Sequence, residues 1–453
     1  MLLVPPFTQS KDAMKRCVFP LGIGYLATVL ELKGYDVKII DSVVEGYTEE
    51  REEENGEITF GLSDTEIEKR IKEYEPDIIG VSCLMTKQSS NAHNICRIAK
   101  KVNPKIKTIM GGTHVSALAE EVIKDKNVDC AVVGDAEETI SDIIENDLRG
   151  IVESKPVNIN KLPYPARHLF SMEKYIEINM PTSCYSPYKR VTQIETTRGC
   201  CFNCCFCATT RFKGNYRMRD IDSVLNEIKF LKDRYDIEEL DIIDSNFILD
   251  KKRTLKLLQG IQKIGIAWSN GGGIWVGGLD EDVIKAMKKS GCYQLSLAIE
   301  SSTPRILKDV INKPTRIEMV EPIVKLCKKY KIDMHAFFVL GFPEQTVDEM
   351  KNDYEFAVKM GFTSASFNII SPLPGSTIYE KYKDKLTFDK IDLRKASIPH
   401  KDILVGDLED MVDKFNNNFN KSLKWRNPLM YFRKYVLTSI RKPKIKKNMF
   451  RRQ

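Results

Sequence analysis

The sequence contains no apolar run long enough to cross a membrane. The longest uncharged apolar run, Val18 to Leu30, has 13 residues and includes Pro20, Gly22 and Gly24, whereas a spanning helix needs about 20. The first residues also lack the basic and long apolar regions of a secretory signal peptide. We therefore expect no transmembrane helix and a location in the cytoplasm, where thiols stay reduced.

The composition lacks the bias of a disordered or fibrous chain. Of the 453 residues, 42% are hydrophobic and 29% are charged, which is typical of a globular protein. A chain of this length is expected to form two or three domains, each with its own buried core.

Acidic residues are absent from the end of the chain. The segment Lys421 to Gln453 holds 12 Lys and Arg, whereas the preceding 420 residues carry 58 basic and 63 acidic groups. Such a basic tail can attract anionic lipid, nucleic acid or an acidic protein. Aromatic residues lie among the cations, and this mixture favours peripheral contact with the inner face of a membrane. The alternatives are a solvated chain end, broken by Pro428 and Pro443, and docking of an acidic electron carrier.

The first 150 residues alternate short apolar strand patterns with amphipathic helical patterns. This α/β alternation predicts a doubly wound, flavodoxin-like parallel sheet, whose ligands bind at the carboxyl ends of the strands. The predicted strands are Leu2–Val4, Asp36–Asp41, Asp77–Cys83, Lys107–Met110 and Cys130–Val133.

Residues 151–190 carry scattered Pro and Tyr and predict an ordered linker. Residues 191–400 resume the alternation and predict a full or partial βα barrel of the TIM type, with its chemistry at the carboxyl ends of the strands. Residues 401–453 predict an amphipathic helix, with Leu408, Val412 and Phe419 on its apolar face, and then the basic tail. The predicted barrel strands are Gln193–Thr196, Glu239–Asp244, Gln294–Ile299, Met334–Leu340 and Ser364–Ile370.

Five of the twelve cysteines fall between Cys200 and Cys207, which favours a metal or redox site in a reducing compartment. The triplet Cys201, Cys204 and Cys207 begins a ferredoxin pattern, but the fourth position is Arg211. A zinc ribbon lacks its second pair, because the next cysteine is Cys292. The triplet Cys200, Cys204 and Cys207 remains, with the spacing C-x3-C-x2-C. The seven cysteines outside this run are expected to be small buried hydrophobes.

The C-x3-C-x2-C run resembles the signature of radical S-adenosylmethionine (SAM) enzymes. The resemblance implies that Cys200, Cys204 and Cys207 hold a [4Fe–4S] cluster, whose remaining iron binds SAM and cleaves it to a 5′-deoxyadenosyl radical. Phe206 matches the aromatic residue that the family places near the adenine. Segments at later strand ends also match the family, and they imply SAM contacts from Asp244, Asn246 and Glu300.

The N-terminal domain is similar to the cobalamin-binding domain found in one branch of this family. The matching segments include Pro20–Leu26, Gly111–His114 and Gly134–Thr139. The D-x-H-x-x-G motif, whose His binds cobalt in cobalamin mutases, is absent, so we expect no cobalt-ligating His. For His114, lining of the crevice for the nucleotide tail and a structural role both stay open. The implied cobalamin contacts are Thr86, Gly112, Thr113, His114, Gly134, Asp135 and Glu137.

The resemblance implies a cobalamin-dependent radical SAM enzyme that methylates an unactivated carbon of a small or lipid-like substrate. The main alternative uses the same cofactors for ring closure or rearrangement, as in the oxidative cyclase of chlorophyll synthesis. A methylthiotransferase acting on transfer RNA would need a second cysteine cluster, so nucleic acid is not expected as a partner. A cofactor sensor would not need the SAM contacts. The expected electron donor is a low-potential flavodoxin or ferredoxin.

Overall fold

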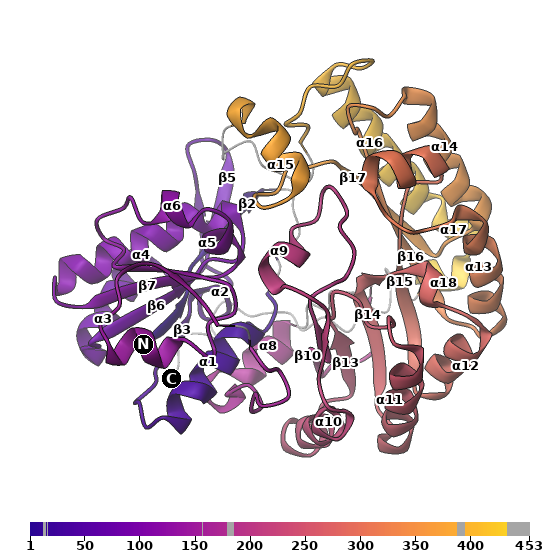
Figure 1. Ribbon diagram of the computed structural model, residues 1–453. Helices are drawn as coiled ribbons and strands as arrows, with labels where there is room; N and C mark the ends of the chain where they lie inside the picture. Colours follow the sequence, from indigo (N-terminus) through magenta and orange to yellow (C-terminus); the bar gives the residue numbers. More distant parts are fainter. Residues whose placement is uncertain (12–14, 16, 156, 179–184, 387–394, 433–453) are drawn as a thin grey trace. The chain divides into compact units, whose positions relative to one another are not determined.

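The computed structural model describes the chain except for residues 12–14, 16, 156, 179–184, 387–394 and 433–453. The described residues form two compact units, one within residues 1–178 and the other within residues 185–432 (Figure 1). Each unit contains a parallel sheet of six strands. The predicted combination of two α/β folds is therefore confirmed.

The main sheet of the first unit has the strand order β3-β1-β6-β7-β8-β9. All neighbouring pairs are parallel. The order reverses at β1, so the carboxyl ends of β1 and β6 flank the switch point at which such sheets bind ligands. The strands are β1 (Leu2–Val4), β3 (Ile39–Asp41), β6 (Ile78–Ser82), β7 (Lys107–Gly111), β8 (Cys130–Val133) and β9 (Gly150–Glu153).

The five predicted strands of this sheet are present, but four further strands were not predicted. One is β9, a short edge strand in which Ile151 and Glu153 are both exposed, so its sequence lacks an apolar face. The others form a small antiparallel sheet of β2 (Phe7–Ser10), β5 (Glu57–Phe60) and β4 (Glu50–Glu52). These strands have only three or four residues each, which is too short for a clear alternating pattern.

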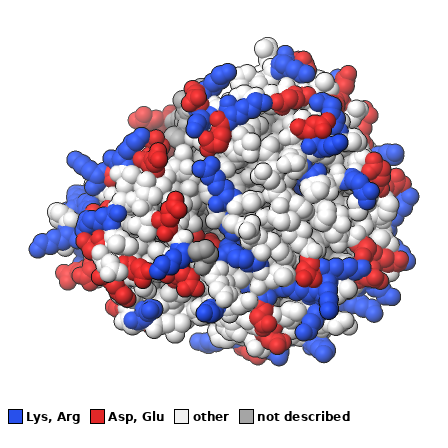
Figure 2. Space-filling view, in the orientation of Figure 1, with Lys and Arg blue, Asp and Glu red and all other residues white. Residues whose placement is uncertain are grey.

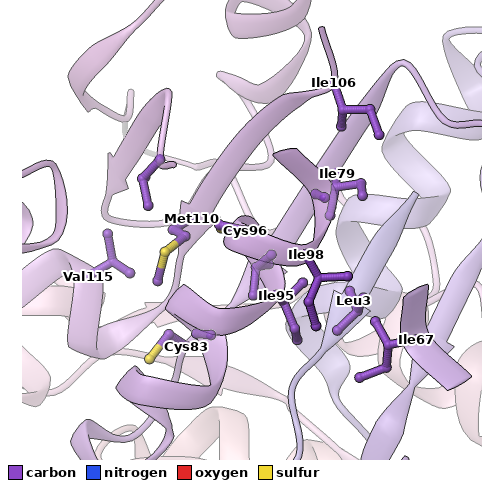
Figure 3. Packing of buried hydrophobic residues seen from close by; sticks show 14 of the residues in the cluster. Leu3, Ile67, Ile79, Cys83, Ile95, Cys96, Ile98, Ile106, Met110 and Val115 are labelled. Atoms are coloured by element: carbon purple, nitrogen blue, oxygen red, sulfur yellow. The ribbon is translucent and has the colours of Figure 1, made fainter. Parts of the chain in front are cut away.

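The core of the first unit lies between its sheet and the helices α3 (Asp64–Tyr74) and α4 (Ser89–Val102). Figure 3 shows Leu3 and Ile79 of the sheet close to Ile67 of α3 and to Ile95 and Ile98 of α4. Full burial of each such side chain stabilises the fold by about 1.5–3 kcal/mol. The core therefore holds the strands in place, while their carboxyl ends remain available for a ligand.

The second unit contains a sheet with the strand order β10-β13-β14-β15-β16-β17, and all neighbouring pairs are parallel. Its outer strands, β10 and β17, do not pair with each other within the described residues, so the barrel is partial. The predicted strands are confirmed, and β14 was missed because Gly271–Gly273 interrupts its apolar pattern. The strands are β10 (Val191–Ile194), β13 (Glu239–Ile242), β14 (Ala267–Ile274), β15 (Cys292–Glu300), β16 (Asp333–Leu340) and β17 (Ser364–Ile369).

Helix α16 (Val405–Lys421) covers the free edge of β17. The side-chain oxygen of Asn416 accepts a hydrogen bond from the backbone N–H of Phe367 at 2.9 Å, and its Nδ2 donates to the carbonyl of the same residue at 2.8 Å. The amide thus replaces a neighbouring strand at an edge that would otherwise expose unpaired backbone groups. The predicted helix is confirmed, and Leu408, Val412 and Phe419 are buried. The tail beyond residue 432 lies outside the described residues.

A buried polar network occupies the amino ends of the strands in the second unit. The Oε1 atom of Glu239 accepts hydrogen bonds from Ser269 Oγ and Tyr293 Oη, both at 2.7 Å. Ser186 donates to the other carboxylate oxygen. Burial raises the pKa of Glu239 to about 7, although these hydrogen bonds oppose the shift.

We predict that Glu239→Gln reduces the pH dependence of stability. The pKa of Glu239 is about 7 in the folded protein, above its ordinary value of 4.5, so the folded state retains the proton longer than the unfolded state. The contribution of Glu239 to the free energy of unfolding is therefore fully present below the pKa of the unfolded state. It is lost as the pH rises through the pKa of the folded state, and the loss amounts to about 3 kcal/mol. Anaerobic urea unfolding at about pH 5 and about pH 8 would measure this loss. The same pH dependence in both proteins would contradict the prediction.

Candidate functional site

The cysteine loop follows the carboxyl end of β10. Strand β11 (Thr197–Arg198) pairs with β12 (Arg217–Met218), so the two strands close a loop that contains all five clustered cysteines. Gly199 enters this loop with a φ of +84°, and a Cβ at this position would lie 2.4 Å from the carbonyl oxygen of Asn215. A larger residue would displace the closing strand, so glycine is required immediately before Cys200.

The structure brings the thiols of Cys200, Cys204 and Cys207 near one another. Cys204 interacts electrostatically with both other thiols, and the backbone N–H of Cys207 donates to the carbonyl of Cys204 at 3.0 Å. No group of three His, Cys, Asp or Glu side chains among the described residues is spaced to hold a single metal ion. A cubane cluster does not need such spacing, because each thiolate binds a different iron atom. The three thiols therefore fit a [4Fe–4S] cluster.

The two other cysteines of the loop occupy different environments. Cys201 is exposed, whereas Cys205 packs against a hydrophobic cluster that includes Ile311 and Ile378. The backbone of Cys205 is bonded to both of these residues at 2.9 Å, and burial raises the pKa of its thiol to about 12. Cys205 thus anchors the loop to the core. Outside the loop, the six described cysteines are buried as predicted, and Cys184 lies outside the described residues.

Asp244 connects the end of β13 to the start of the cysteine loop. Its carboxylate accepts from the N–H and Oγ1 of Thr196, both at 2.6 Å, and from Thr197 Oγ1 at 2.8 Å. Asp244 is 1% exposed, and burial raises its pKa. Both carboxylate oxygens are occupied, so the structure gives Asp244 a role in positioning the loop. Its contact with SAM stays a prediction.

Asn246 and Phe206 are the other predicted SAM contacts near the loop. Asn246 is 3% exposed, and its Oδ1 has no hydrogen-bond partner within the described part of the chain. A buried unpaired amide oxygen is costly, so this atom fits a donor group of a bound ligand. Phe206 packs against Phe342, with 6.4 Å between ring centroids. Its contact with adenine is a prediction that the structure leaves open.

Glu300 has a partner that sequence analysis did not find. Its Oε1 accepts from Lys313 Nζ at 2.7 Å, and both side chains are more than 90% buried. Lys313 also donates to the carbonyl of Ala298 at 2.9 Å and interacts with the Cys204 thiol. The ion pair gives the buried carboxylate of Glu300 a structural partner, and its contact with SAM stays a prediction. The sequence does not indicate this pairing, because a single Lys before Pro314 forms no recognisable motif. The two side chains meet only because the fold returns the chain to the end of β15.

The predicted cobalamin residues meet at the carboxyl ends of β6, β7 and β8. Gly112 has a φ of +110°, and a Cβ there would lie 2.5 Å from the carbonyl oxygen of Cys83. Ser116 Oγ accepts from the N–H of Gly134 and donates to the carbonyl of Gly112, both at 3.0 Å. Thr113 donates to the carbonyl of Leu84. These bonds bring two glycine turns together at the ligand edge of the sheet.

His114 is buried at this edge. Its Nδ1 lies 3.2 Å from Thr86 Oγ1, and burial, with a smaller contribution from His93, lowers its pKa to about 4. The imidazole is therefore neutral at neutral pH. Asp135 is half-buried and Glu137 is buried on the loop after β8. All seven predicted contacts thus lie near one edge, although their contacts with cobalamin remain predictions.

An exposed apolar surface beside Thr86 fits a large ring-shaped ligand. Leu84 and Met85 are 52% and 48% exposed, and both belong to the loop that follows β6. Such exposed apolar side chains at a ligand-binding edge indicate a binding surface. Together with the glycine turns, they leave space and apolar surface at the edge of the sheet where we predict that cobalamin binds.

We predict that Cys200→Ala, Cys204→Ala and Cys207→Ala each abolish cluster binding, because each removes one of three thiolate ligands. Cys201→Ala and Cys205→Ala are the matched controls and should retain the cluster. Iron content and the visible absorbance of anaerobically reconstituted protein would measure the difference. Equal loss of iron in Cys201→Ala and Cys204→Ala would contradict the assignment.

We also predict that cobalamin binds without a His ligand to cobalt. The paramagnetic resonance spectrum of bound Co(II) should show no splitting from an imidazole nitrogen, and His114→Ala should leave this spectrum unchanged. His93→Ala serves as a control for general disturbance of this region. An imidazole signal that disappears in His114→Ala would overturn the prediction.

Two families match the chain in succession. The B12 binding domain family matches residues 12–144, and the radical SAM superfamily matches residues 194–357. The chain is 32% identical over 428 residues to a cytidylyl-2-hydroxyethylphosphonate methyltransferase of Streptomyces wedmorensis. The aligned region covers 83% of this chain and 80% of that relative. It is 24% identical over 430 residues to an anaerobic magnesium-protoporphyrin IX monomethyl ester cyclase of Rubrivivax gelatinosus, covering 89% of this chain and 73% of the relative.

A solved structure has the same fold. It is that of a radical S-adenosylmethionine methyltransferase, TsrM, from Kitasatospora setae, with a TM-score of 0.67 and 16% identity over 84% of this chain and 76% of that one. The order of the two domains, the cysteine spacing and the identity over most of the chain agree with the predicted family. The chain belongs to the cobalamin-dependent radical SAM enzymes, whose cofactors are a [4Fe–4S] cluster, SAM and cobalamin.

Proposed function

We propose that the protein transfers a methyl group from SAM to a carbon atom of a small-molecule substrate. The observation that carries this proposal is the presence of both cofactor domains in one chain, together with 32% identity to a relative named as a methyltransferase. A cobalamin domain supplies a methyl carrier, and a radical SAM domain supplies a means of activating an unreactive carbon.

The residues of the second unit would hold the cluster and orient SAM. Cys200, Cys204 and Cys207 would bind three irons, which leaves the fourth open. The unpaired Oδ1 of Asn246 would accept a hydrogen bond from SAM. Lys313, buried next to Cys204, would offset negative charge from the thiolates and from Glu300.

The inner face of the second sheet offers a surface for the substrate. Ala298, Phe337 and Ser366 are adjacent across β15, β16 and β17, and all three are partly exposed. Their chain neighbours Leu297, Phe338 and Phe367 are buried on the opposite face. An aromatic ring beside small and hydroxyl-bearing side chains suits a compact organic substrate.

Nucleic acid is not part of this proposal. Figure 2 shows Lys and Arg side chains interspersed with Asp and Glu on the visible face, rather than gathered into one basic surface. Nucleic-acid binding depends on such a surface, because it neutralises a row of phosphates.

Anaerobic turnover with methyl-deuterated SAM tests the methyl transfer. We expect an extract of the source organism to yield a product that is heavier by one labelled methyl group, formed together with 5′-deoxyadenosine and S-adenosylhomocysteine. Cys204→Ala should form neither the labelled product nor 5′-deoxyadenosine. Formation of 5′-deoxyadenosine without transfer of the label would contradict methylation and favour ring closure or rearrangement, an activity consistent with the similarity to the cyclase.

The proposal includes a low-potential flavodoxin or ferredoxin as electron donor. Its support is the position of the cysteine loop at the surface, where Cys201 is exposed. Arg211 and Lys213 on α9 (Thr209–Lys213) lie beside this loop, where they form ion pairs with Glu380 and Glu195, both at 3.3 Å, and an acidic carrier would compete for these cations. Acidic electron carriers are attracted to such cations, and the association should weaken as salt increases.

We further propose that the C-terminal region contacts an anionic membrane. No helix among the described residues is long and apolar enough to cross a bilayer. However, Trp425, Leu429 and Phe432 are 79%, 63% and 47% exposed, on or next to the short helices α17 (Leu423–Arg426) and α18 (Pro428–Tyr431). Exposed Lys421 and Lys424 lie beside them. Apolar side chains flanked by cations complement the headgroup region of an anionic leaflet.

Co-sedimentation with anionic vesicles tests this contact. We expect the full chain to bind at low salt, and both a chain ending at Ser422 and the triple variant Trp425→Ala, Leu429→Ala, Phe432→Ala to bind less. Leu404→Ala with Val405→Ala is a matched control, because those apolar residues are exposed at the other end of α16. Equal binding by the full chain and the triple variant would rule out the membrane contact.

A further inference from the structure

A buried carboxylate on α14 (Val347–Met360) is bonded to two separate loops of the second unit. Asp353 is fully buried, and its oxygens accept from Ser301 Oγ at 3.0 and 3.1 Å and from Ser302 Oγ at 2.7 Å. The backbone N–H of Ser302 donates at 2.5 Å and Gln345 Nε2 at 3.0 Å. A single side chain of the outer helical layer thus binds donors from the ends of β15 and β16.

The first of these loops begins at Glu300, which has an unusual backbone conformation. Its φ is +67°, and the pairing of β15 with β16 shifts register between Ala298 and Glu300. A residue other than glycine persists in this region only when its surroundings hold it, because the backbone conformation is unfavourable. Lys313 holds the Glu300 side chain, and Asp353 holds the two residues that follow. The turn is therefore fixed from both sides.

The second loop is fixed through Gln345. Its Oε1 accepts from the N–H of Gly341 at 3.0 Å, and its carbonyl accepts from His400 Nε2 at 2.7 Å. Gln345 is itself fully buried. Asp353 consequently connects the Glu300 turn to the Gly341–Gln345 loop and, through that loop, to the segment around His400.

Packing alone does not explain an acid at position 353. The other buried residues of α14, which are Met350, Ala357 and Met360, are apolar, and an apolar residue at 353 would avoid the cost of burying a carboxylate. A carboxylate provides several directional hydrogen bonds that an apolar side chain cannot. Fixing the orientation of the strand-end loops is the function that this arrangement supports.

We propose that Asp353 is a positioning residue for SAM binding, which acts by holding the turn that presents Glu300 to SAM. This inference rests on the proposed function and, within it, on the predicted contact between Glu300 and SAM. In this positioning role, Asp353 itself contacts neither the cysteine loop nor a cofactor.

The first test compares Asp353→Asn with Asp348→Asn in the reconstituted full-length enzyme. Asp348 lies on the same helix, and its side chain is 88% exposed, so it controls for loss of charge on α14. We expect Asp353→Asn to weaken SAM binding by about tenfold or more in anaerobic titration calorimetry, with iron content unchanged. The change that SAM causes in the paramagnetic resonance spectrum of the reduced cluster should require correspondingly more SAM. Unchanged SAM affinity, even with a lower melting temperature, would overturn the proposal.

The second test asks whether Asp353 acts through Glu300. In a Glu300→Gln background, Asp353→Asn should weaken SAM binding by less than about twofold, because the effects of residues that act together are not additive. The same loss in both backgrounds would show that Asp353 does not act through Glu300. If Asp353→Asn does not fold, Ser301→Ala removes one donor to the carboxylate and should weaken SAM binding by about threefold.

The outcomes separate this inference from the proposed function. If Glu300→Gln leaves SAM affinity unchanged while labelled methyl still reaches the product, the positioning proposal fails and the methyltransferase assignment stands. If SAM affinity follows the expected pattern but no label is transferred, the positioning role stands and methyl transfer fails.

Discussion

Hydrogen bonds to buried carboxylates fix the strand ends on which the radical SAM site depends. Asp244 holds Thr196 and Thr197 at the entrance of the cysteine loop, and Asp353 holds Ser301 and its neighbour after β15. Neither loop belongs to a regular element that could define its shape. Since a carboxylate binds several donors in fixed directions, one side chain gives each loop a single conformation.

These hydrogen bonds act on a sheet that is already closely packed against its helices. Leu295, Leu297 and Ile299 bury one face of β15 completely, and that packing supplies stability without specifying the loops. Burying a charge is unfavourable unless it is well bonded. The polar contacts therefore add little to the net stability of the fold but determine where Glu300 and the cysteines lie. Losing one partner would leave the other buried and unpaired, so it should lower the stability of the fold as well as disturb the loops.

The two units offer different surfaces to their cofactors. In the first unit, glycine turns and the exposed side chains of Leu84 and Met85 form an open edge, which leaves space for a wide ring. In the second unit, thiols and a buried ion pair between Glu300 and Lys313 form a compact polar site, which suits an iron–sulfur cluster and a charged sulfonium.

The sequence by itself determined the features that depend on short-range order. Apolar periodicity located ten strands and the helix that carries Phe419, and the spacing of Cys200, Cys204 and Cys207 indicated the cluster, because strand patterns and ligand spacing are local properties of a chain. Glycine turns at strand ends were visible for the same reason. Strand β14 was missed where Gly271–Gly273 removes the apolar pattern on which such a prediction depends.

Only the tertiary structure decided which polar groups meet. Lys313 reaches Glu300 across 13 positions, and Asp353 reaches Ser301 across 52, and neither pair shares a helix face or a strand face. Whether a buried acid pairs with a cation, with hydroxyl groups or with a ligand depends on how the chain returns to the same strand end. That return is set by the packing of the whole sheet, which no local pattern in the sequence encodes.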